Sequence, residues 1–130
     1  MYSMKETCEK VDMNYETLKF YCNQGLVPNV KRDKWNHRVF DDRDIAWIQS
    51  LTCLKNCGMS ISEMKTYVDL CKQGENSIPE RKEILRIKKD ALLEQMNLLK
   101  QCIDYIDWKQ QFYDDVLSGK TKYFSNLIDS

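Results

Sequence analysis

The feature that most constrains the fold is a long apolar stripe in the second half of the chain. Between Pro79 and Leu117 the sequence has no further proline and no glycine, so nothing interrupts a helix there. Two neighbouring columns of mostly large apolar side chains repeat every seven residues, which places both on one side of a helix. The columns are Ile84, Ala91, Leu98, Tyr105 and Phe112, and Leu85, Leu92, Leu99, Ile106 and Tyr113. A lone helix cannot bury such a stripe, and we expect the same helix of a second copy to cover it.

The N-terminus carries the signals of two short helices joined by a tight turn. Ser3 is an N-cap candidate with Glu6 in the capping-box position, and Asn14 is a second N-cap candidate. The second helix is expected to end at Gly25, a residue suited to the position after a helix. The inner faces are Met4, Thr7, Cys8 and Val11 in the first helix, and Leu18, Tyr21 and Cys22 in the second. This arrangement indicates a helix-turn-helix.

The segment that follows, residues 29–40, is polar and basic. Its only acid is Asp33, and Asn36 suits a hairpin tip because asparagine tolerates a positive φ. The sequence around Val39 is typical of a β-strand, so we predict a β-hairpin, or wing. The cationic and titratable side chains on it are Lys31, Arg32, Lys34, His37 and Arg38.

Two further helices are predicted before the long one. Asp41 and Asp42 open the first, and Gly58 stops it. Ser60 caps the second, with Glu63 in the capping-box position. Residues 74–77 are a short linker, and Pro79 lies in the first turn of the long helix. The fold class is therefore mainly α, with a helix-turn-helix and wing domain over residues 1–74 and a long helix with its tail over residues 75–130. In that tail, residues 123–128 form either a last turn or a docking segment.

Composition and cysteine content narrow the possible functional classes of the protein. Lysine plus arginine equals aspartate plus glutamate at 20 each, so nucleic-acid binding would depend on a local basic face. No export signal or membrane span is evident, and we expect a cytoplasmic protein with reduced thiols. The six cysteines and one histidine lack the spacing of a structural zinc site, and we expect no metal and no cofactor. No pairing of nucleophile and base suggests an enzyme.

Several motifs together resemble the MerR family of transcriptional regulators. The segment 2–4, Tyr-Ser-Met, resembles that family's opening Tyr-Thr-Ile, and 17–21, Thr-Leu-Lys-Phe-Tyr, resembles Thr-Leu-Arg-Tyr-Tyr of its recognition helix. The segments 25–27, 36–40 and 58–61 resemble the Gly-Leu-Leu/Ile, Gly-Tyr-Arg-x-Tyr and Gly-Met-Ser-Leu that follow in order. The resemblance implies a winged helix-turn-helix head followed by a long antiparallel coiled-coil dimerisation helix. It extends to about Leu117.

The chain departs from the family pattern at three positions. Lys19 replaces the usual arginine, which keeps the charge and loses the bidentate fork. Asn36 replaces the wing glycine, and Glu16 places an acid on the recognition helix. These departures bear on the strength and target of DNA binding and leave the fold unchanged.

The resemblance implies a homodimer that reads an inverted repeat in promoter DNA and distorts it in response to an effector, with RNA polymerase as a further partner. Lys19 and Tyr21 would contact the DNA backbone, Tyr15 and Glu16 would approach base edges, and the wing would grip phosphates. The predicted DNA-binding residues are Asn14, Tyr15, Glu16, Lys19, Phe20, Tyr21, Arg32, Lys34, His37 and Arg38. The alternative is an ordinary solvated charged face with Phe20 and Tyr21 in the core.

For the effector, residues 53–59 are similar to the aldehyde- and nitrosative-stress-responsive branch of the family, the AdhR/NmlR type. That branch has a key cysteine five residues before the Gly-Met, where this chain has Cys53. A thiolate attacks electrophiles, so Cys53 is the predicted effector thiol. Three alternatives stay open: Cys53 as a small core residue, a regulator that senses a non-covalent ligand, and a coiled-coil interaction protein without DNA binding. No additional ligand domain of the drug-sensing kind is expected.

Overall fold

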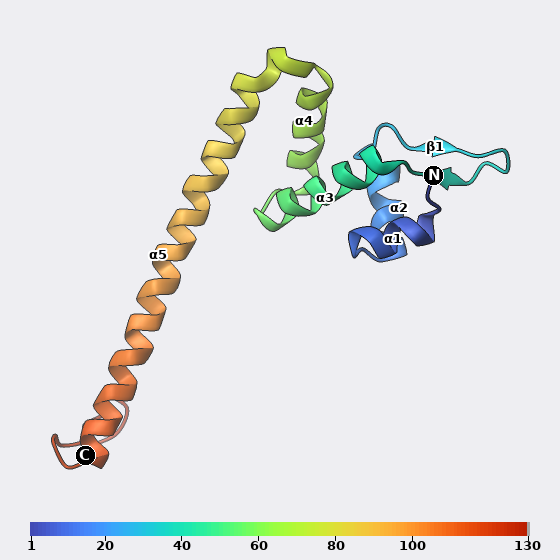
Figure 1. Cartoon of the computed structure of the whole chain (residues 1–130). Coiled ribbons are helices and arrows are strands. Elements are labelled where there is room, and N and C mark those ends of the chain that lie inside the picture. Colours follow the sequence, from blue (N-terminus) through green and yellow to red (C-terminus); the bar gives the residue numbers. More distant parts are fainter. Residues whose placement is uncertain (130) are drawn as a thin grey trace. The chain divides into compact units, whose positions relative to one another are not determined.

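A computed structural model describes residues 1–129, and its ribbon is mainly helical with one small hairpin (Figure 1). The elements in chain order are α1 (Met4–Val11), α2 (Tyr15–Asn23), β1 (Lys31–Arg32), β2 (Arg38–Val39), α3 (Asp42–Asn56), α4 (Ile61–Lys72), the 3-10 helix η1 (Gly74–Ser77) and α5 (Ile78–Leu117). They form two compact units. We call the first, Met1–Lys89, the head, and the second, which begins at Asp90, the tail unit.

Local hydrogen bonds start each short helix where the sequence predicts it. The Ser3 hydroxyl accepts from the Glu6 amide at 3.1 Å, while the Glu6 carboxylate accepts from the Ser3 amide at 3.0 Å. Ser60 and Glu63 repeat this reciprocal pair at the start of α4. At α3 a capping box forms as well, with Asp44 in place of the usual glutamate or glutamine. Each box satisfies amides that the first turn of a helix leaves without a partner.

The predicted hairpin is confirmed as a two-stranded antiparallel wing. Lys31 lies opposite Val39, and Arg32 lies opposite Arg38. Asn36 has a φ of 63° at the tip, which is the left-handed conformation predicted for it. The base of the wing pairs with the N-terminus, because the Tyr2 amide donates to the Phe40 carbonyl at 2.6 Å.

One core holds α1, α2, the wing base, α3 and α4 together. Leu18 on α2, Phe40 at the wing base and Ile48 on α3 are all fully buried in it. A buried side chain of this size stabilises the fold by roughly 1.5–3 kcal/mol. The remaining core members are Val11, Tyr21, Leu26, Val27, Leu51, Met59, Met64 and Val68. The helix-turn-helix and the wing therefore rest on a common support.

The start of α5 packs on the head, so the compact head unit includes residues beyond 74. The predicted linker 74–77 is the 3-10 helix η1, whose buried Ser77 hydroxyl contacts the Leu70 carbonyl. Arg81 then donates to the Gly74 carbonyl at 2.7 Å, and Ile84 packs against the core. These contacts keep the first turns of α5 within the head, and the second compact unit begins only at Asp90.

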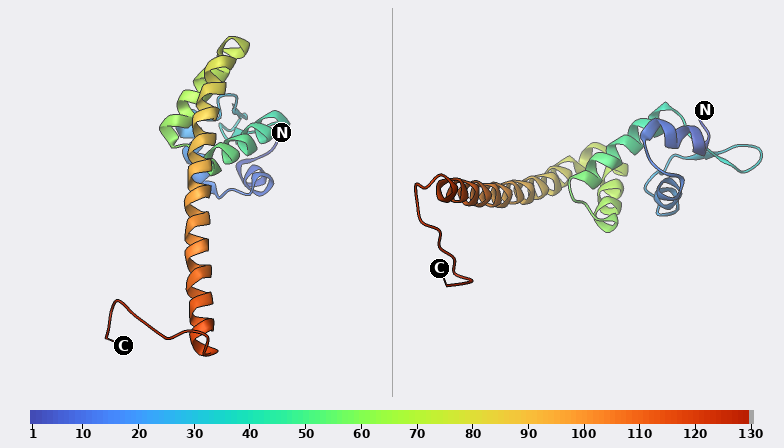
Figure 2. Two further views of the ribbon diagram at one scale, coloured as in Figure 1. Left: turned by 90° about the vertical axis from the view of Figure 1, so that its left-hand side faces the viewer. Right: turned by 90° about the horizontal axis from the view of Figure 1, so that it is seen from below.

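In the tail unit α5 continues without a break, as both views in Figure 2 show. No described residue of α5 is buried, and Leu98 and Leu99 are 60% and 63% exposed. Beyond Leu117 the chain is not helical, and the Phe124 ring meets the Phe112 ring at a centroid distance of 5.0 Å. This ring contact places part of the tail against the end of α5. Within residues 1–129 no helix is both long and apolar enough to cross a bilayer.

Candidate nucleic-acid interface

The helix α2 presents a mixed aromatic and charged face to solvent. Tyr15 is 51% and Phe20 is 44% exposed, and Glu16 and Lys19 lie on the same exposed side. Leu18 on the opposite side is fully buried. Asn14 begins the helix, and its side-chain oxygen accepts from the Thr17 amide at 2.8 Å. Tyr15, Glu16, Lys19 and Phe20, four of the predicted DNA-binding residues, therefore all face solvent.

Tyr21 lies in the core instead of on this face. It is 2% exposed, and its buried hydroxyl has no hydrogen-bond partner among the described residues. Burial raises the pKa of this phenol, because the charged form loses solvation. The reason for the burial is helical spacing, since Tyr21 follows Leu18 by three residues and shares its side of the helix. The predicted backbone contact of Tyr21 with DNA does not agree with this position.

The wing is attached to the end of α2 by a direct side-chain contact. The guanidinium Nη2 of Arg38 donates to the Asn23 Oδ1 at 2.6 Å. Across the hairpin, the Nη1 of Arg32 donates to the Asn36 carbonyl at 3.0 Å. Sequence reasoning had assigned Arg38 only to phosphate contact, and Asn23 had no predicted role. Their contact joins the wing to the end of α2.

A groove of about 410 Å³ brings together part of the predicted set. Tyr15 lines it from the start of α2, and Lys5 contributes a cation from α1 that the sequence analysis did not single out. The other lining residues are Ser3, Met4, Arg32, Asp33, Asn36, His37, Arg38 and Val39. Three permanent cations and a histidine face one carboxylate here, so the groove is locally positive although the chain is neutral overall.

The remaining predicted residues lie outside this groove. Lys34 is at the wing tip, where its Nζ lies 4.4 Å from the centroid of the Trp35 ring. Trp35 itself is 67% exposed, and no sequence pattern singled it out. The sequence feature that could have indicated Trp35 is its place beside a lysine within the basic predicted hairpin. Glu16, Lys19 and Phe20 occupy the adjoining face of α2.

The wing base is held by an ion-pair cluster. Lys31 on β1 lies 3.0 Å from the Asp41 carboxylate and 3.6 Å from that of Asp44, which is 3% exposed. The Asp44 amide and then the Lys31 ammonium lower the pKa of Asp41 to about 2. Asp41 therefore serves two purposes, as the N-cap of α3 and as the anchor of the wing strand.

The cysteines do not converge on a site. Cys53 lies exposed on α3, and Cys102 lies exposed on α5. Burial raises the pKa of the Cys22 and Cys8 thiols, as expected of cysteines beside a core. Among residues 1–129 no group of three or more histidine, cysteine, aspartate or glutamate side chains could hold a metal ion.

A helix-turn-helix, a basic wing attached to its second helix, and two further helices leading into a long exposed helix define a winged helix-turn-helix protein. The family model described as MerR HTH family regulatory protein matches residues 2–71. The chain belongs to this family. It is a MerR-family transcriptional regulator and not an enzyme.

Individual relatives agree with this assignment. An uncharacterized HTH-type transcriptional regulator of Haemophilus influenzae is 35% identical over 86% of this chain and 83% of its own length. The HTH-type transcriptional regulator AdhR of Bacillus subtilis is 32% identical over 71% of this chain and 66% of its own length. Among solved structures, HiNmlR, a MerR-family regulator lacking the sensor domain and bound to promoter DNA, superposes with a TM-score of 0.76. It is 33% identical, and the match covers 90% of this chain and 93% of HiNmlR. These relatives support the predicted AdhR/NmlR branch.

Proposed function

We propose that this regulator binds promoter DNA through the exposed face of α2 and the basic wing. The observation that carries the proposal is the positive groove between Tyr15 on α2 and the wing, described above. Cations on a hairpin beside an exposed helix suit a duplex, because the helix fits the major groove while the cations meet phosphates. The likeness to HiNmlR, which was solved with promoter DNA, supports the same partner here.

The exposed stripe on α5 supports a homodimer. Leu99 and Ile106 are 63% and 56% exposed in the single chain, and they belong to a column that repeats along the whole helix. An apolar surface of this length calls for a partner, and an antiparallel copy of α5 offers a matching stripe. Two heads related by a twofold axis would then read an inverted repeat.

For the effector, the proposal is an electrophile or thiol stress signal received at Cys53. The thiol is exposed to solvent on α3, and its sequence context resembles the aldehyde-responsive branch. Alkylation or oxidation would add bulk or charge to α3, the helix that connects the wing to α4. The outcome would be a change in the distortion of bound DNA, read by RNA polymerase.

Binding to the DNA upstream of the gene, measured across a salt series, tests the DNA-binding part. For a protein that neutralises phosphates, the logarithm of affinity falls with the logarithm of salt by about 0.9 for each contact. We compare the wild type with Arg32→Gln in the groove and with Lys82→Gln, an exposed lysine on α5. Arg32→Gln is expected to weaken binding and reduce the salt slope by about 0.9.

The control separates a local contact from a general loss of positive charge. Lys82→Gln removes one charge, as Arg32→Gln does, and is expected to leave both affinity and slope unchanged. Equal effects of the two variants would show that DNA affinity depends on the net charge of the protein and not on this groove. If no fragment from that region binds in a salt-dependent way, the chain is an interaction protein that does not use this surface for DNA.

A further inference from the structure

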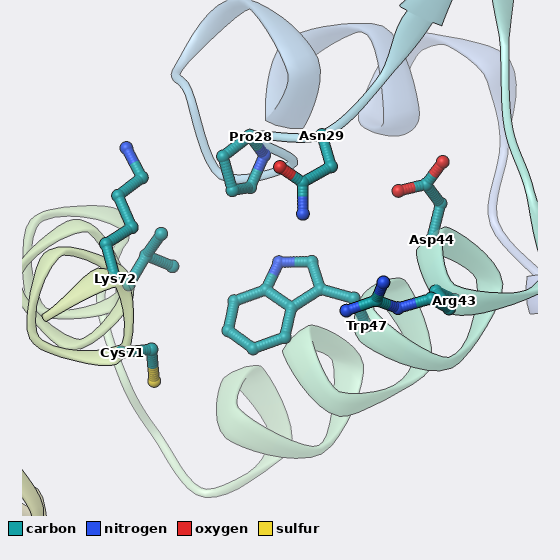
Figure 3. Close-up of a pocket in the computed structure, with 8 residues that line it drawn as sticks. Pro28, Asn29, Arg43, Asp44, Trp47, Cys71 and Lys72 are labelled. Carbon is teal, nitrogen blue, oxygen red and sulfur yellow. The ribbon is translucent and has the colours of Figure 1, made fainter. Parts of the chain in front are cut away.

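A second pocket of about 540 Å³ lies in the head, away from the positive groove. Figure 3 shows the indole of Trp47 in its middle, with Pro28 and Asn29 on one side and Cys71 and Lys72 on another. Arg43 and Asp44 from α3 and Val68 from α4 complete the lining. The volume falls within the range of about 300–1,000 Å³ that small-molecule sites occupy.

Two helices, α3 and α4, each line this pocket with residues from one side. Arg43 and Trp47 are four residues apart on α3, so they lie on one side of that helix. On α4 the spacing of Val68, Cys71 and Lys72 likewise places them on one side. The pocket walls are therefore parts of rigid helices that the common core supports, and the half-buried indole forms an aromatic surface within them.

The Trp47 ring is held in position by a hydrogen bond. Its Nε1 donates to the Leu26 carbonyl at 2.7 Å, and the Leu26 amide in turn donates to the Tyr21 carbonyl at 3.0 Å. Because the indole nitrogen is engaged, the pocket offers the face of the ring instead of a polar edge. A planar aromatic molecule can stack on such a surface.

The charges around the pocket favour an anion. Arg43 is exposed and makes no hydrogen bond or ion pair with any residue in the range 1–129. Lys72 has only a loose contact of 3.9 Å with Asp69, an exposed residue on the same helix. The one lining carboxylate, Asp44, forms an ion pair with Lys31 and accepts a hydrogen bond of 3.0 Å from the Asp41 amide. Two available cations thus flank an aromatic surface.

We propose that this pocket is an effector site for a small planar aromatic carboxylate, with the ring on Trp47 and the carboxylate at Arg43. The inference rests on the proposed DNA-binding function and adds a non-covalent signal to it, independent of Cys53. Lys72 contributes a second positive charge, and the Asn29 amide can donate to the carboxylate.

The position of the pocket explains how occupancy would reach DNA. Trp47 is bonded to Leu26, in the turn that ends α2, and Pro28 and Asn29 lead directly into β1 of the wing. Asp44 is paired with Lys31 on that strand. A ligand here contacts the segment that joins α2 to the wing. If the ligand binds more tightly to one relative position of α2 and the wing, its binding changes the affinity for DNA.

Titration of the ¹⁵N-labelled full chain with 2-naphthoate tests binding by NMR, without DNA. The chain has three tryptophans, so three indole N–H signals report separately, and the variants Trp35→Phe and Trp108→Phe assign them without altering Trp47. We expect a saturable shift of the Trp47 signal, and a Kd about fivefold higher for Arg43→Gln, as for the loss of one partly exposed ion pair. Lys82→Gln is expected to bind as the wild type does, and the neutral 2-naphthamide is expected to bind more weakly.

Four results would overturn the site. The first is no saturable shift at Trp47, including the case in which only the Trp108 signal moves. The second is equal binding of naphthoate and naphthamide, and the third is an unchanged Kd for Arg43→Gln. The fourth is a loss of DNA affinity in Arg43→Gln without any naphthoate, which would make Arg43 a phosphate contact.

The regulatory part is measured separately, as DNA affinity with and without saturating 2-naphthoate. We expect at least a fivefold change, the lower end of ordinary coupling between two sites, and in Arg43→Gln we expect the same change to need about five times more naphthoate, in line with its weaker binding. An unchanged DNA affinity in the wild type would overturn the effector role. If the chain binds no DNA at all, the proposed function fails, whereas the NMR titration still decides whether the pocket binds the anion.

Discussion

The Nη2 of Arg38 on the wing donates a hydrogen bond of 2.6 Å to the Oδ1 of Asn23 at the end of α2. The contact joins the two elements of the proposed DNA interface, which are separated by fifteen residues in the chain. Arg38 thus combines a positive charge in the groove with a positioning contact, and substitutions of the two partners can separate these contributions.

Asn23→Ala removes the positioning contact and keeps the charge. We expect a loss of about fivefold in promoter affinity with an unchanged salt slope, because no phosphate contact is deleted. Arg38→Gln is expected to lose more affinity and to reduce the slope by about 0.9. Salt-series binding isotherms of both variants decide this. A reduced slope in Asn23→Ala would show that the wing detaches from DNA when the contact is lost.

Tyr21→Phe tests whether the buried phenol has any part in DNA binding. The hydroxyl is buried without a partner among the described residues, so its removal is expected to be neutral or to stabilise the fold by about 1 kcal/mol. Urea unfolding measures the stability, and the salt series measures the affinity, which we expect to stay at the wild-type value. A clear loss of affinity with intact stability would restore Tyr21 to the DNA interface.

Asp41 offers a pH-dependent test of the wing base. Its pKa is lowered to about 2 in the folded state, so its ionised form stabilises the fold above the ordinary value near 3.8. That contribution is lost as the pH falls through 2. Asp41→Asn keeps an N-cap side chain and removes the ion pair with Lys31. We expect its Tm to lie below that of the wild type at pH 7, with the difference closing between about pH 4 and pH 2.

Asp41→Ala is the companion variant, because it removes the cap as well. Its Tm is expected to fall below that of Asp41→Asn at every pH, since alanine cannot accept the Asp44 amide at the start of α3. A Tm difference between wild type and Asp41→Asn that does not change with pH would contradict the depressed pKa.

Leu99→Glu tests the apolar stripe of α5. A carboxylate in the centre of a helix–helix interface loses its solvation, and we expect the dimer dissociation constant to rise roughly 100-fold. Asn97→Glu adds the same charge on the polar side of the helix and is expected to leave the dimer intact. Sedimentation equilibrium gives both constants. If both variants dissociate to the same extent, the weakening of the dimer comes from the added charge and not from its place on the apolar stripe.

Cys53→Ser tests the proposed effector thiol. Wild-type protein treated with a small aldehyde is expected to show an altered promoter response that Cys53→Ser lacks. Cys102→Ser is the matched control, since its thiol is also exposed and lies on α5. A reporter strain provides the readout. Retention of the response in Cys53→Ser would remove this thiol from the mechanism and leave the regulator itself unaffected.

The sequence alone determined the features that depend on neighbouring residues. Ser3 with Glu6, Asn14 before α2, and Ser60 with Glu63 predicted helix starts because a cap joins residues three apart, whatever the rest of the chain does. The stripe on α5 and the left-handed Asn36 were likewise predictable from local pattern.

Only the tertiary structure decided which side chains from distant segments meet. It joined Arg38 to Asn23, packed the start of α5 onto the head through Arg81, and placed Trp47 between the turn after α2 and α4. These outcomes depend on how several amphipathic helices share one close-packed core. Spacing along the chain specifies the apolar side of each helix, whereas the packing of all of them together determines which residues that side touches.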